Sequence, residues 1–93
     1  MKIFPQLHDA TLKQVEFVWA KALLLFYFAI EGKTVCLSAH GVSSISCDRK
    51  LPWGPSVSVN EIKIDKEEDT SKLTIEMQSG DLIVAWIKTY ELK

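Results

Sequence analysis

The stretch Leu51–Ile64, LPWGPSVSVNEIKI, carries the strongest local signals in the chain and decides how the rest is interpreted. Its two prolines, Pro52 and Pro55, fix their own φ angles and push the residues before them out of the helical region. The glycine between them can adopt angles that are closed to other residues. Trp53 is therefore expected to lie in a stiff, extended corner that cannot be helical.

The residues after this corner predict a strand. Apolar and polar side chains alternate over residues 57–64 with the period of a half-buried strand. The apolar positions slip by one residue between Val59 and Ile62, so we expect a β-bulge at Asn60 or Glu61. A rigid corner thus leads directly into a strand.

Two more strands follow and form a hairpin. Residues 73–78 alternate apolar and polar side chains, and residues 82–87 are apolar on both faces. Between them, Ser79-Gly80-Asp81 predicts a tight connection in which Gly80 takes a left-handed conformation. This pair is the clearest hairpin in the sequence.

Two strand patterns also stand near the start of the chain. Residues 12–19 alternate, with Phe17 and Trp19 on one face. Residues 22–30 are apolar on both sides, which suits a central strand covered on both faces. We expect Trp19, like Trp86 in the last strand, to belong to the core.

The same region could instead form one buried helix from Asp9 to Gly32. Aspartate is a common helix cap, and the alanines, leucines and lysines between the two positions are good helix formers. Against a helix stand the many β-branched and aromatic residues and the loss of any polar face after Lys21. We therefore favour two strands joined near Ala20 and Lys21.

Together these signals predict an all-β protein with a single domain over residues 1–93. About six strands with short connections and no strong helix indicate an antiparallel meander that forms a curved sheet or a partly open barrel. A chain of 93 residues leaves no room for a second domain. Ile3, Phe4 and Leu7 are expected to dock on the body of the domain.

The balance of charged residues in the sequence argues against two classes of binding partner. The chain has eleven basic against twelve acidic side chains and an isoelectric point near 6.1, so it lacks the basic face that nucleic acid or an anionic membrane surface would need. No apolar leader precedes Pro5, and the apolar run 22–30 is too short to span a bilayer. We therefore expect a cytoplasmic protein with neither a nucleic-acid nor a membrane partner.

The cysteines and acids suggest no cofactor. Cys36 and Cys47 are too few for a disulfide framework and lack the spacing of a metal site, so we expect both thiols to be reduced and buried. Glu67, Glu68 and Asp69 do not have the spacing of a calcium loop and are typical of a solvated hairpin connection. The prediction is a protein without metal or cofactor.

His8 and Asp9 are the one adjacent pair of imidazole and carboxylate, and such a pair can act as a general base with its orienting group. Neighbouring side chains on an extended strand point to opposite sides, which favours a structural interpretation. In it, Asp9 bonds backbone amides at the start of the first strand, and His8 either packs on the domain or donates one hydrogen bond. A thiolate served by His40 lacks a recognisable oxyanion loop, so we expect no enzyme.

Trp53 is the main candidate for recognition. A rigid exposed tryptophan can anchor an interface, whereas a buried one would plug the open end of a curved sheet. The plug is favoured, because tryptophans are mostly buried. The candidate interaction or ligand site comprises Trp53, Ser56, His8 and Asp9.

Three segments carry a resemblance to known proteins. They are LHDA at 7–10, PWGPS at 52–56 and EMQSGD at 76–81. Together they resemble small uncharacterised bacterial proteins that form a domain of unknown function. The opening segment is also similar to that of some immunity proteins of bacterial polymorphic toxin systems. The resemblance implies a compact, β-rich bacterial domain without established catalytic residues.

The leading functional hypothesis is a non-enzymatic protein-interaction domain, such as a toxin-neutralising immunity protein. It would recognise a protein partner, or a second copy of itself, through a sheet edge or the Trp53 corner. The first alternative is a binder that holds a small apolar ligand inside the curved sheet near Trp19, Trp53 or Trp86, which requires an open cavity of at least about 300 Å³. The second alternative, an enzyme, requires His8 and Asp9 to point into one cleft.

Overall fold

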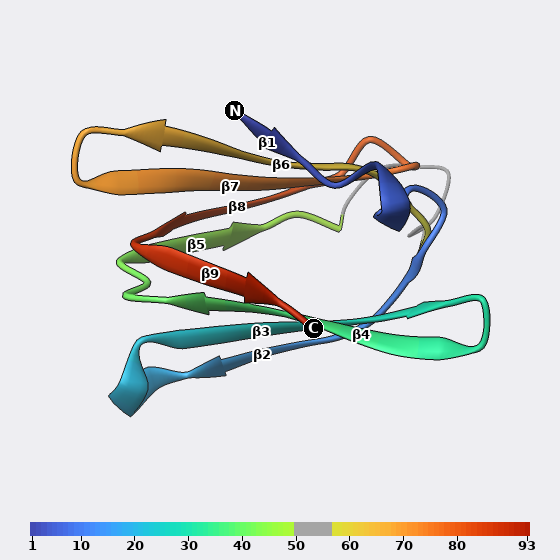
Figure 1. Ribbon diagram of the computed structural model, residues 1–93, viewed down its shortest axis with the longest axis horizontal. Helices are drawn as coiled ribbons and strands as arrows, with labels where there is room; N and C mark the ends of the chain where they lie inside the picture. The colour runs from blue at the N-terminus through green and yellow to red at the C-terminus, as the bar shows by residue number, and fades with distance from the viewer. Residues whose placement is uncertain (50–56) are drawn as a thin grey trace.

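The computed structural model describes residues 1–49 and 57–93, which form two layers of antiparallel sheet (Figure 1). One sheet has five strands in the order β1-β6-β7-β8-β5, and the other has four in the order β2-β3-β4-β9. The strands are β1 (Lys2–Ile3), β2 (Thr11–Val18), β3 (Leu23–Ile30), β4 (Lys33–His40), β5 (Ser44–Cys47), β6 (Val59–Glu67), β7 (Thr70–Met77), β8 (Leu82–Ile87) and β9 (Thr89–Leu92), with the short 3-10 helices η1 (Pro5–Leu7) and η2 (Trp19–Lys21).

The expected all-β antiparallel class is confirmed, but the number and grouping of the strands differ from the prediction. The described residues form nine strands rather than about six, and they lie in two sheets instead of one meander. The chain changes sheet after β1, after β4 and after β8. At the crossing after β4, Gly41 has a φ of 66°. At the crossing after β8, the amide of Lys88 donates to the carbonyl of His40 at 2.9 Å. Such short crossings leave no periodic signal in the sequence.

The two-strand interpretation of residues 10–31 is confirmed. β2 and β3 pair antiparallel from Thr11 opposite Ala29 to Val18 opposite Leu23, with a register shift between Leu12 and Gln14, and η2 joins them. Ala22 closes this connection with a φ of 48°, and its amide donates to the carbonyl of Trp19 at 3.1 Å. The alternative helix is excluded, because both strands have the extended backbone that the aromatic and β-branched side chains favour.

The expected bulge and hairpin are also present. The register of β6 against β7 shifts between Val59 and Glu61, at the predicted site. β7 and β8 are neighbours, and Gly80 in their connection has a φ of 96° with its amide bonded to the carbonyl of Met77 at 2.8 Å. Local alternation and turn chemistry were therefore sufficient to place these elements.

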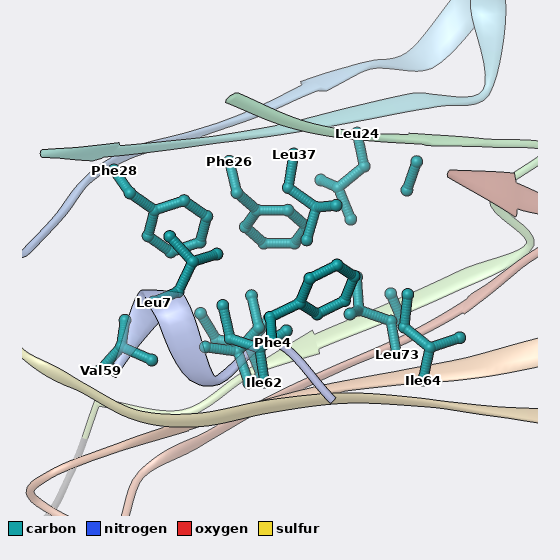
Figure 2. Packing of buried hydrophobic residues seen from close by; sticks show 14 of the residues in the cluster. Phe4, Leu7, Leu24, Phe26, Phe28, Leu37, Val59, Ile62, Ile64 and Leu73 are labelled. Carbon is teal, nitrogen blue, oxygen red and sulfur yellow. The ribbon is translucent and has the colours of Figure 1, made fainter. Parts of the chain in front are cut away.

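The core lies between the two sheets and continues over the N-terminal segment (Figure 2). β3 and β4 contribute one wall, and β6, β7 and β8 contribute the other. Phe4 and Leu7, on either side of Pro5 and Gln6, insert between them as expected, whereas Ile3 is 40% exposed. The largest fully buried side chains are Phe26, Phe28, Leu7, Leu24, Leu37, Ile62, Leu73, Ile75, Ile87 and Val59.

Two tryptophans expected in the core lie outside it. Trp19 is 84% exposed, because it lies beyond the end of β2 in η2, where the opposite sheet does not reach it. Trp86 is half-buried on the outer face of the five-stranded sheet, with the Lys72 ammonium 6.0 Å from its ring centroid. The alternation of apolar residues predicted that both tryptophans lie in strands or at strand ends. It did not identify which face of each strand packs against the core.

Two further expectations are corrected. β3 is covered on one face only, since Leu23, Leu25 and Tyr27 on its outer face are half-buried while their neighbours along the strand are fully buried. Both cysteines are free, but Cys47 is exposed on the outermost strand β5, and Cys36 is only partly buried. Burial of both thiols was therefore a wrong prediction.

The proline corner with Trp53 and Ser56 lies outside the described residues, so its predicted roles stay predictions. Across residues 1–49 and 57–93, no helix has both the length and the hydropathy needed to cross a membrane.

Candidate functional site

His8 and Asp9 lie side by side just after η1, contrary to the expectation that they diverge. Asp9 has a φ of 70°, and this left-handed turn brings its Oδ1 to 3.6 Å from His8 Nε2. The other ring nitrogen, Nδ1, donates to the carbonyl of Asn60 at 2.7 Å; because a carbonyl only accepts, Nδ1 carries a proton. The expected single hydrogen bond from His8 is thus present.

The partners of Asp9 differ from those expected. Its side chain accepts from the Nε2 of Gln78 rather than from backbone amides, while its own amide donates to the carbonyl of Val59 at 2.9 Å. Asn60, at the bulge, donates to Glu76 at 2.7 Å. These bonds tie the N-terminal segment to β6 and to the end of β7.

The His8–Asp9 pair has the features of a structural tie. The two side chains are 54% and 71% exposed, so little water is excluded around them. In the part of the chain that the structure describes, no group of three or more His, Cys, Asp and Glu side chains could hold a metal ion. Of the four predicted site residues, the structure brings these two together; Trp53 and Ser56 lie outside the described residues.

The more distinctive surface is the free edge of β2. β2 is the outermost strand of the four-stranded sheet and pairs with β3 on its inner side (Figure 1). On its outer side, the described residues cover only its start, where Thr11 bridges Ser58 and the amide of Leu12 donates to the carbonyl of Val57 at 2.7 Å. Within residues 1–49 and 57–93, no other strand pairs with the outer side of β2 from residue 13 to 18.

An apolar row follows this edge and consists of Val15, Phe17 and Trp19. Val15 and Phe17 pair across the sheet with the fully buried Phe26 and Leu24, so they belong to the core-facing side of β2. They nevertheless remain 37% and 36% exposed, and the indole of Trp19 lies 5.8 Å from the ring of Phe17. The core-facing side of the sandwich is thus only partly covered at Val15 and Phe17.

A cleft of about 400 Å³ opens beside Val15 of the apolar row, and residues of β2, β7 and β8 and the end of β5 line it. Its apolar wall includes Leu12, Val15, Met77 and Ile83. The remaining lining residues are Lys13, Gln14, Cys47, Asp48, Arg49, Val57 and Asp81. The cleft is a place for an apolar group from outside the molecule.

The polar groups around the cleft do not form a nucleophilic site. Partial burial, and secondarily the charge of Asp48, raise the pKa of the Cys47 thiol above its ordinary value, which lowers the thiolate fraction at neutral pH. The carboxylate of Asp81 is buried but accepts from the Ser79 hydroxyl at 2.8 Å. The proposed pairing of His40 with a reactive cysteine therefore gains no support.

Sequence reasoning missed the β2 edge because it assigned Phe17 and Trp19 to the core. The available signal was the exceptional apolar content of residues 12–30, which exceeds what one covered face requires. Periodicity distinguishes the two faces of a strand but not a central strand from an edge strand.

Comparison with known proteins supports the fold and does not assign a function. No protein-family model matches the chain, and no curated protein matches it significantly. A crystal structure of an uncharacterised protein from Neisseria gonorrhoeae is similar, with a TM-score of 0.77 and 18% sequence identity over 99% of this chain and 95% of that one. At this identity, the similarity establishes a shared two-sheet fold alone.

Proposed function

We propose that this protein is a non-enzymatic protein-interaction module whose contact surface is the open edge of β2. The observation that carries the proposal is the row of Val15, Phe17 and Trp19, of which Trp19 is 84% exposed. Tryptophan is usually well buried in a monomer and is among the residues that contribute most to binding at interfaces. A partner that covers this row would complete the apolar packing along β2.

The edge offers two complementary kinds of contact. The backbone along residues 13–18 can pair with an added strand, which supplies affinity through main-chain hydrogen bonds. The apolar row and the adjoining cleft supply side-chain selectivity. Neutralisation of a toxin, the alternative that goes with the similarity of the opening segment to immunity proteins, would be one interaction of this kind.

A second candidate function is the binding of a small apolar ligand, and the cleft beside β2 favours it. Its volume of about 400 Å³ exceeds the lower bound of about 300 Å³ for such a site. Leu12, Met77 and Ile83 give it an apolar wall. Titration with an environment-sensitive apolar dye, carried out on the wild type and on Val15→Glu, distinguishes the two candidate functions. If the protein binds a small apolar ligand, monomers of the wild type bind the dye and monomers of Val15→Glu do not.

The experiment for the interaction proposal is affinity capture from cells of the source organism by tagged wild-type protein and by Trp19→Ala. The matched control is Leu82→Ala, which removes an apolar side chain of 39% exposure from the other sheet. We expect a specific protein, including untagged copies of this chain, to be retained by the wild type and Leu82→Ala and lost with Trp19→Ala. Capture that is insensitive to Trp19, or absent under conditions where the fold is intact, would overturn the proposal.

A further inference from the structure

We draw no further inference here: the strongest candidate, the apolar row of Val15, Phe17 and Trp19 at the β2 edge with the cleft of about 400 Å³ beside it, is a partly covered face on which nothing in the described residues shows what binds.

Discussion

The two flanks of the sandwich, each bordered by one edge strand of each sheet, differ in how far side chains cover the core. On one side, β1 and β9 flank the ring of Phe4, which contacts Tyr90 edge-on at 5.9 Å, with the Lys2 ammonium 5.5 Å from its centroid. On the other side, β2 and β5 leave Val15 and Phe17 partly exposed and a cleft between the sheets. One side is closed by its own chain, and the other is open.

The edge strands on the two sides also differ in length and in charge. β1 has two residues and β9 has four, and β9 carries Glu91 in an ion pair with Lys93 at 3.2 Å. Short, charged edge strands resist unwanted pairing. β2 has eight residues, with no charge on its core-facing side from Val15 onward. β5, with four residues, is as short as β9. Among the four edge strands of the described residues, β2 is therefore the long one, and its core-facing side lacks charge from Val15 onward.

The largest effect is expected on the closed side. Phe4→Ala removes a ring that is 3% exposed and lies between the sheets, and it should lower the free energy of unfolding by about 3–5 kcal/mol. Urea denaturation at low protein concentration measures this change. Tyr90→Phe keeps the edge-on ring contact and serves as a control with little effect. A loss below about 1 kcal/mol for Phe4→Ala would show that this side is not closed by core packing.

A charge on the open edge should have a smaller effect on stability and a large one on association. Phe17→Lys places an ammonium group on the core-facing side of β2, and we expect a loss of about 1 kcal/mol in unfolding free energy together with loss of partner capture. Thr89→Lys adds the same charge to the edge strand β9 and should leave partner capture unchanged. Urea denaturation and affinity capture compare the two variants, and equal behaviour would remove the distinction between the sides.

The surface hydrogen bond of His8 should contribute less to the free energy of unfolding than the core residues of the N-terminal segment do. His8→Ala removes the donor to the Asn60 carbonyl at 2.7 Å, and since the group is exposed we expect a cost of about 0.5–1 kcal/mol. His40→Ala, another exposed histidine, is the matched control. A loss comparable to that of Phe4→Ala would mean that the tie, rather than the core, holds this segment.

The smallest effect concerns the Cys47 thiol at the cleft. Its pKa is raised in the folded protein by partial burial and by Asp48, so the unfolded chain ionises at lower pH than the folded one. Folding stability should therefore fall slightly as the pH rises through and above the ordinary thiol pKa, and should not change with this group at neutral pH. Thiol-reagent kinetics against pH in a Cys36→Ser background, folded and in urea, measure the two pKa values. Equal values would contradict the partial desolvation of the Cys47 thiol at the cleft.

Sequence reasoning predicted much of the local structure and little of the candidate site. The bulge at Asn60, the turn at Gly80 and the two strands of residues 10–31 followed from alternation and turn chemistry, which act over a few neighbouring residues. Of the predicted site, His8 and Asp9 form a surface tie, whereas Trp53 lies outside the described residues. The open edge was missed because an apolar alternation has the same pattern in a central strand and in an edge strand.

What the sequence determined by itself is that the chain forms antiparallel strands with tight connections, because side-chain alternation and backbone preference depend on adjacent residues. The tertiary structure decided which strands became edges. Among the described residues, β2 is outermost because β3 takes one of its sides and the distant residues Val57 and Ser58 contact the start of the other. The exposure of Trp19 is a consequence of that assembly: it depends on which distant segments pack nearby, and no local pattern encodes that choice.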